Sequence, residues 1–359
     1  MHPALWPAVK SPPLVDAATE ARIAAIVKRM SLEEKVGQTI QSDISMVTPA
    51  DLRKYPLGSV LAGGDSGPYG DERAKPAEWL KLAREFHAVA LENRPGHEPI
   101  PVIFGVDAVH GHNNVVGAEL YPHNIGLGAM HDPELVRRIA EATAEEVATT
   151  GIDYAFAPTI AVPQDVRWGR SYEGFSSDPV LVTKYASAAV LGLQGPNGME
   201  HRLARGRVAA SIKHFLGDGG TTLGEDQGNT EVSEETLARV HAPGYAAGIE
   251  AGALTVMASY NSWNGQKMHG SKALLTDILK GRMGFQGFVI GDYNAHAALP
   301  GCTKEHCPDA LNAGLDMYMA PLGWRAGRVT PHGWSNWLLG AMFRHTVSHS
   351  WLGSGVRTG

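Results

Sequence analysis

The sequence predicts an α/β fold, a (β/α)8 TIM-like barrel, and three observations support this prediction. Eight short, mainly apolar runs alternate with helical segments between residues 36 and 320. Strands of this kind are parallel and are covered by helices on the outside. A chain of 359 residues, 43% of them hydrophobic, is long enough for such a barrel. We therefore expect one barrel domain over residues 16–320, incomplete at its C-terminal end.

The predicted strands lie in runs that end in glycine or in polar residues. In chain order these runs are VGQTIQSD, GSVLAGGD, IPVIFGVDAVHG, IDYAFAPTIAV, VAASIKHFLGD, ALTVMASYNSW, GFVIGDYNAH and LDMYMA. The alternative fold is an open, doubly wound sheet, which favours an early glycine-rich phosphate turn. The glycines of GDGGTTLG follow the fifth run and match neither GxGxxG nor GK[ST]. The barrel is therefore the preferred interpretation.

Helix starts are marked by capping residues. An N-cap aspartate or serine, often followed by proline at the first helical position, indicates where a helix begins. The candidates are Asp16, Ser31 with Glu34 in a capping box, Asp132 before Pro133, and Asp178 before Pro179. These starts provide the helices that the barrel requires between its strands.

Outside the barrel we expect an N-terminal arm, residues 1–15, and an atypical tail, residues 321–359. The tail contains no Asp, Glu or Lys but four tryptophans, Trp324, Trp334, Trp337 and Trp351, and no sustained helical period. An eighth strand should be followed by an amphipathic helix. We interpret the tail as frameshifted or non-native, with an unusual genuine terminus as the alternative.

Charge and composition exclude several partners. The formal net charge is −6 and no basic cluster is present, so we expect no nucleic acid partner. No apolar run is long enough to span a membrane, and residues 1–13 lack the apolar core of a signal peptide. The compartment is periplasmic or extracellular if a leader was removed, and cytoplasmic otherwise. Cys302 and Cys307 suit either a local disulfide or two free thiols.

Polar residues that follow the predicted strands form the candidate site, because the ends of parallel strands meet at the C-terminal face of a barrel. We name them the strand-end cluster: Asp107, Arg170, Glu173, Lys213, His214, Tyr260 and Asp292. Carboxylates, cations and an aromatic ring suit a neutral, polyhydroxylated ligand. The structural alternatives are N-caps for the aspartates, an Arg170–Glu173 loop brace, and packing for His214 and Tyr260.

A metal site is a competing interpretation. His110 and His112 in HGHNN lie two residues apart, so on a strand both would face one side as ligands. A metal barrel needs further ligands from other strands, and Lys213 and Arg170 would place positive charge beside the ion. We keep a His-dependent metallohydrolase as an alternative and assign no metal or other cofactor.

Several long motifs in fixed order resemble glycoside hydrolase family 3, and in particular its exo-β-glucanase and β-glucosidase members. They are GVDAVHGHNN, YPHNIGLG, FAPTIAV, RWGRSYEGF, SIKHFLGDGGT, MASYNSWNG and GFVIGDYNAH. The resemblance covers about residues 16–320. It implies that Asp292 is the catalytic nucleophile of a retaining β-glucosidase that releases terminal glucosyl units from β-glucosides or β-glucan oligosaccharides.

The resemblance also implies roles for the other residues of the cluster. Asp107 would bind hydroxyls at the non-reducing end of glucose, and Arg170, Lys213 and His214 would hold others. Glu173 would orient Arg170, and Tyr260 would lie near the nucleophile. Tyr293 stands where the family usually has Trp, as a wall of the leaving-group subsite, which leaves the preference for the leaving group open.

The general acid is missing from this pattern. Two-domain members supply a glutamate from a second, α/β sandwich domain, which we expect to be absent from this chain. Single-domain N-acetylglucosaminidases use a His-Asp pair in KHFPGHGDT, where this chain reads KHFLGDGGT. We therefore expect a two-domain enzyme shortened to its first domain. A sugar-binding barrel without turnover is the alternative.

Overall fold

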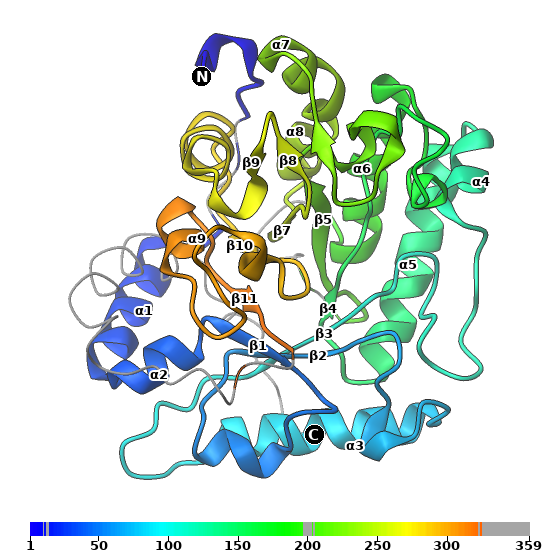
Figure 1. Ribbon diagram of the computed structural model, residues 1–359. Helices are drawn as coiled ribbons and strands as arrows, with labels where there is room; N and C mark the ends of the chain where they lie inside the picture. The colour runs from blue at the N-terminus through cyan, green and yellow to red at the C-terminus, as the bar shows by residue number, and fades with distance from the viewer. Residues whose placement is uncertain (10, 12–13, 197–202, 204, 322–323, 325–359) are drawn as a thin grey trace.

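The computed structural model describes residues 1–324 except residues 10, 12–13, 197–202, 204 and 322–323. In this part of the chain eight parallel strands form a ring whose ends are joined by a bridge between Ile290 and Met317 (Figure 1). In ring order the strands are β10 (Phe288–Ile290), β7 (Thr255–Ala258), β5 (Ala209–Phe215), β4 (Tyr154–Ala155), β3 (Ile103–Val106), β2 (Ser59–Ala62), β1 (Ile40–Asp43) and β11 (Tyr318–Met319). The predicted barrel is confirmed, and each predicted run contributes one strand to the ring.

Helices connect the strands and cover the outside of the ring (Figure 1). They are α1 (Ala17–Arg29), α2 (Leu32–Gly37), α3 (Pro76–Ala90), α4 (Asn124–Ala129), α5 (Pro133–Thr149), α6 (Pro179–Gln194), α7 (Glu234–Thr236), α8 (Pro243–Glu250) and α9 (Pro308–Ala313), with π-helical segments Leu237–His241 and Ala273–Arg282. None of the described helices is long and apolar enough to cross a membrane.

The predicted helix caps are present. Asp16 accepts a hydrogen bond from the Thr19 N–H, and Ser31 and Glu34 form the reciprocal capping box. Asp132 and Asp178 cap α5 and α6, each with proline at the first turn. Side-chain acceptors satisfy backbone N–H groups that the helix leaves unpaired, so these local patterns fix the starts of the outer helices.

The barrel strands bury apolar side chains on both faces, one inside the barrel and one against the surrounding helices. One face of the strands fills the interior with a compact cluster: Leu61, Tyr154, Phe156, Ala209, Met257, Phe288, Ile290, Met317 and Met319. The other face, for example Val60 and Phe104, belongs to the larger core that includes Trp79 and Phe86 of α3. The interior is therefore packed, and two polar side chains buried within the strands, Gln41 and Ser59, are hydrogen-bonded to each other.

A small sheet lies in the connections after β5 and β7. Strands β6 (Asn229–Thr230) and β8 (Ser262–Trp263) pair in parallel, and β8 pairs with β9 (Gln266–Lys267) as a hairpin. Both turn residues, Asn264 and Gly265, have positive φ angles of 46° and 86°, as a two-residue hairpin turn requires. Its hairpin, formed by β8 and β9, lies between Tyr260 and His269 in the sequence.

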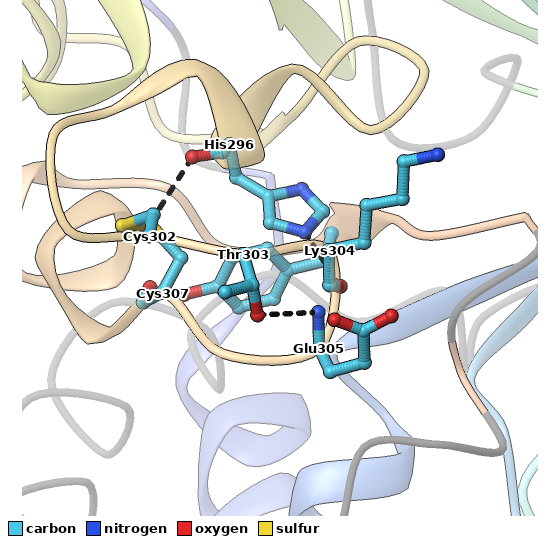
Figure 2. Close-up of a disulfide and its surroundings, with 7 residues drawn as sticks. His296, Cys302, Thr303, Lys304, Glu305 and Cys307 are labelled. Atoms are coloured by element: carbon cyan, nitrogen blue, oxygen red, sulfur yellow. Dashed lines mark hydrogen bonds between the residues drawn. A yellow bond between two sulfur atoms is a disulfide. The ribbon is translucent and has the colours of Figure 1, made fainter.

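The two cysteines form a disulfide, which the sequence left open (Figure 2). It closes the connection between β10 and α9, and His296 lies beside it with its Nε2 2.9 Å from the Lys304 carbonyl. The hydroxyl of Tyr318 in β11 donates to the Cys307 carbonyl at 2.5 Å. The loop that follows the candidate nucleophile is therefore tied to the last strand of the barrel.

The two terminal segments differ in what the structure describes. In the N-terminal arm Trp6 is buried, and its Nε1 donates to Glu234 at the start of α7. Of the predicted tail, Pro321 and Trp324 are described, and Trp324 is buried with its ring edge-on to Tyr55. Residues 325–359, on which the prediction of a non-native tail depends, lie outside the described residues.

Candidate active site

Asp292 lies two residues beyond β10, at the C-terminal mouth of the barrel. Its backbone N–H donates to Nε2 of His269 at 3.0 Å, and its Oδ1 accepts from the Tyr293 N–H at 2.7 Å. Its side chain is 15% exposed. The backbone of Asp292 is thus fixed by His269 and its carboxylate by the Tyr293 N–H, and a carboxylate that is held in place yet reachable from solvent suits a reacting group.

The surroundings of Asp292 act on its pKa in both directions, and the net effect is to raise it. Burial raises the pKa of Asp292, whereas the Tyr293 N–H, Arg170 and Lys213 lower it. The negative charge of Asp107 also raises the pKa of Asp292. A nucleophilic carboxylate must be ionised, and the two neighbouring cations favour that form.

Lys213 and Asp107 join β5 to the end of β3. The ammonium group of Lys213 donates to Asp107 Oδ1 at 2.6 Å. The Lys213 side chain is 6% exposed and that of Asp107 is 43% exposed. The carboxylate thus remains accessible to a ligand while the lysine fixes its position.

Arg170 connects the loop after β4 to β5. It donates to both oxygens of Glu173, at 2.7 and 2.9 Å, and its Nη2 lies 3.2 Å from Nε2 of His214. Burial lowers the pKa of Arg170, but the Glu173 bonds outweigh it and the net pKa is raised. The predicted Arg170–Glu173 brace therefore exists and also directs the guanidinium toward the cluster.

His214 is the central contact of the cluster. Its Nε2 lies 3.8 Å from Asp292 Oδ2, and its Nδ1 lies 3.0 Å from Asp218 Oδ2. Burial, followed by Arg170 and Lys213, holds the pKa of His214 well below its usual value. The imidazole is therefore neutral at physiological pH.

Tyr260 follows β7, and its hydroxyl donates to the Tyr293 carbonyl. Burial raises the pKa of Tyr260 to about 12, with a further contribution from Asp292. The Tyr293 side chain is 40% exposed. The contact between Tyr260 and the Tyr293 carbonyl joins the end of β7 to the segment that carries Asp292. The ring of Tyr293 remains accessible to a ligand.

Short contacts thus link the strand-end cluster in three groups: Asp107 with Lys213; Arg170 with Glu173, His214 and Asp292; and Tyr260 with the segment that carries Asp292. Sequence reasoning missed two further members, Asp218 and His269. Asp218 ends the KHFLGD motif and His269 follows QKM, so both lay near recognised segments. The partner of His269 is set by the packing of separate strand ends. Asp218 lies only four residues after its partner His214, so its place in the KHFLGD motif was the available signal.

The metal alternative depends on His110 and His112, which have separate surroundings. His112 is buried edge-on to Trp79, and its Nε2 lies 3.0 Å from Thr150 Oγ1. Burial lowers its pKa to about 4. The His110 ring instead lies against His123, with centroids 4.5 Å apart. Among the described residues no group of three or more His, Cys, Asp or Glu is placed to hold a metal ion. The metallohydrolase alternative has no geometric support in that part of the chain.

Comparisons with known proteins identify relatives of this barrel. The chain is 32% identical over 329 residues to a lysosomal beta glucosidase of Dictyostelium discoideum, covering 85% of this chain and 40% of the relative. A solved exo-1,3/1,4-beta-glucanase from a Pseudoalteromonas species is 46% identical with a TM-score of 0.85, over 95% of this chain and 41% of that one. A beta-glucosidase from Listeria innocua in complex with isofagomine is 25% identical with a TM-score of 0.72, and the match covers 92% of this chain and 45% of that one.

The chain spans about 40% of the length of the curated relatives it matches. The family model for the glycosyl hydrolase family 3 N terminal domain matches residues 31–324. This match includes the whole strand-end cluster and all eight strands of the ring. The chain therefore belongs to glycosyl hydrolase family 3.

Proposed function

We propose that this protein hydrolyses terminal non-reducing β-D-glucosyl residues of β-glucosides or β-glucan oligosaccharides, with retention, through a covalent intermediate on Asp292. The observation that carries the proposal is the placement of Asp292, held at the barrel mouth by His269 and flanked by Arg170 and Lys213. The relatives named as β-glucosidase and exo-glucanase support the substrate class.

The chemistry follows a double displacement. Asp292 attacks the anomeric carbon as the glycosidic C–O bond breaks, and the leaving oxygen takes a proton from a general acid. Water then attacks the glucosyl ester and restores the carboxylate. The cations near Asp292 help to keep it ionised for the first step.

The rest of the cluster would bind the sugar. Asp107 and Lys213 present a carboxylate and an ammonium group side by side, which suits two neighbouring hydroxyls. Arg170 and His214 would hold others, with Glu173 orienting Arg170. Tyr260 would support the nucleophile segment, and the exposed ring of Tyr293 would line the leaving-group subsite.

We assign no residue of the cluster as the general acid. Asp107 and Glu173 each bond a cation, and Asp218 bonds His214. A general acid contributes about 10²–10⁴-fold by protonating the leaving oxygen, and a very acidic phenol leaves without that help. This chain should therefore react with activated glucosides and turn over cellobiose negligibly.

The experiment is incubation with a dinitrophenyl β-glucoside, followed by mass spectrometry of the peptide that contains Asp292. We expect a burst of phenol and a glucosyl adduct on Asp292, because we assign no residue of the cluster as the base for deglycosylation. Asp292→Asn should give neither, and Asp277→Asn, at an exposed aspartate paired with Lys272, should react like the wild type. A label on another carboxylate would show that the nucleophile is assigned wrongly.

A second candidate function is sugar binding without turnover, favoured by the engagement of the other cluster carboxylates in hydrogen bonds. The same experiment separates the two functions. Binding of isofagomine with no burst and no adduct would support the binding function. Brisk hydrolysis of cellobiose would instead show that the barrel contains an acid.

A further inference from the structure

The two ring nitrogens of His214 face groups of opposite hydrogen-bonding character. Nε2 lies 3.2 Å from Nη2 of Arg170, and Nδ1 lies 3.0 Å from Oδ2 of Asp218. A guanidinium has donors and no acceptor, so Nε2 must accept this bond. Because the imidazole is neutral, its single proton then resides on Nδ1 and is donated to Asp218.

Asp218 is held so that one particular oxygen meets the imidazole. Its Oδ1 accepts the Gly219 N–H at 3.0 Å, which leaves Oδ2 for His214. The turn is tightly packed, because a Cβ at Gly219 would lie 2.7 Å from the Val162 carbonyl oxygen. Burial raises the pKa of Asp218 to about 7, against the opposing effects of Arg170 and the Gly219 N–H. Above pH 7 the carboxylate is ionised and acts as the acceptor.

We propose that Asp218 is a positioning residue that holds His214 as its Nδ1–H tautomer, so that the Nε2 lone pair receives Arg170 and keeps the guanidinium turned into the site. Asp218 acts through His214 and Arg170. The effect on sugar binding rests on the proposed function, whereas the tautomer does not.

The geometry indicates which variant reverses this arrangement. In Asp218→Asn the carbonyl oxygen would keep the bond from the Gly219 N–H, and the amide NH₂ would face Nδ1 of His214. An amide NH₂ donates, so Nδ1 would become the acceptor and the ring proton would move to Nε2. Two donors, Nε2–H and Arg170, would then oppose each other. The tautomer of a histidine is set by its second partner, and this variant changes that partner alone.

The test is a long-range ¹H–¹⁵N correlation spectrum of the chain labelled with ¹⁵N-histidine, at pH 8. His214→Gln identifies the signals of His214 by their loss. We expect a protonated Nδ1 and an unprotonated Nε2 in the wild type, and the reverse in Asp218→Asn. A wild-type His214 protonated on Nε2 would overturn the proposal, as would an unchanged tautomer in a folded Asp218→Asn protein. The wild-type spectrum decides the matter even where the variant fails to fold.

Glu34→Gln is the matched control, because Glu34 is a buried carboxylate that contacts Nδ1 of His97 at 3.2 Å outside the site. It should change the His97 signals and leave those of His214 unchanged. Isofagomine titrated by calorimetry should bind Asp218→Asn at least ~10-fold more weakly than the wild type, since a misdirected buried donor is costly. Failure of the wild type to bind isofagomine would count against the proposed function, and the tautomer result would stand independently.

Discussion

Two aspartates flank the last strands of the barrel, and they differ in burial and in how fully their oxygens are satisfied. Asp316 precedes β11, where it accepts the Val289 N–H at 2.8 Å and pairs with Lys280 at 2.7 Å. Asp292 follows β10, and Oδ2 of its side chain faces His214 at 3.8 Å. The side chain of Asp316 is 4% exposed and that of Asp292 is 15% exposed.

Under the proposed function, the difference separates a residue of stability from a residue of the site, at the two ends of neighbouring strands. Asp316 lies toward the N-terminal end of the barrel strands, where its charge is neutralised and its oxygens are bonded. Asp292 lies at the C-terminal mouth, where burial opposes its charge and one oxygen is left for a ligand. In β/α barrels the first end serves stability and the second serves chemistry. The following predictions test that division.

The largest expected effect on stability comes from Asp316→Asn. Removing one partner of a buried ion pair leaves Lys280 without its counter-charge, which typically costs about 3–5 kcal/mol. Asp292→Asn should leave the free energy of unfolding unchanged or raise it, because burial disfavours the native charge. Urea unfolding of the two variants measures both. Equal losses of stability would contradict the division.

The second prediction concerns pH and Asp218, whose pKa burial raises from 3.8 to about 7. A native pKa above the unfolded one means that the folded protein binds this proton more tightly. The associated stability is fully present below about pH 3.8 and is lost as the pH rises through about 7. Stability of the wild type minus that of Asp218→Asn should therefore fall by up to about 4 kcal/mol across this interval.

Urea unfolding at a series of pH values gives this difference. Buried histidines such as His241 and His269, whose pKa values burial lowers to about 4 and about 3, produce the opposite slope. They are present in both proteins, so they cancel in the subtraction. A difference that stays flat or rises with pH would show that the Asp218 carboxyl is not protonated preferentially in the folded state.

The third prediction concerns His269, which accepts the backbone N–H of the candidate nucleophile. Burial lowers its pKa to about 3, so the ring is neutral at neutral pH, and the bond from the Asp292 N–H identifies Nε2 as the unprotonated nitrogen. His269→Ala should slow formation of the glucosyl adduct about 10- to 100-fold, because a buried N–H is left unpaired and the segment shifts. The rate of the phenol burst is the measurement.

His296→Ala is the control for this prediction. His296 is equally buried, but its Nε2 lies 2.9 Å from the Lys304 carbonyl, beside the disulfide (Figure 2). If this variant slowed the burst as much as His269→Ala, the effect would reflect loss of packing and not loss of the contact to Asp292.

The barrel could be predicted from the sequence because strands and helix caps depend on residues that are close together in the chain. Most of the eight runs combine apolar residues with a polar end, and the capping residues Asp16, Ser31, Asp132 and Asp178 act within four residues of themselves. The strand-end cluster followed from one topological rule, that parallel strands deliver their ends to one face. Its members could therefore be named before their contacts were known.

The contacts themselves could not be predicted from the sequence. Asp107 and Lys213 are 106 residues apart, and Asp292 and His269 are 23 residues apart. Whether a buried histidine serves packing or the site depends on which strand end faces it. His112 contacts Thr150 and Trp79 in the outer layer. His214 contacts Asp218 and Arg170 at the barrel mouth.

The smallest expected effect comes from an exposed ion pair on the outer surface. Arg53 donates to Glu92 through a two-pronged contact, with side chains 52% and 34% exposed. Its geometry resembles the Arg170–Glu173 pair, but water screens the charges. Glu92→Gln should shift the urea midpoint far less than Asp316→Asn, and the shift should vanish in about 1 M salt, where the screening length is ~3 Å. The loss in Asp316→Asn should persist at that salt concentration, because Asp316 and Lys280 are buried. If both losses vanished in salt, the contrast between the two ends of the barrel would reduce to long-range charge effects, and burial would not explain it.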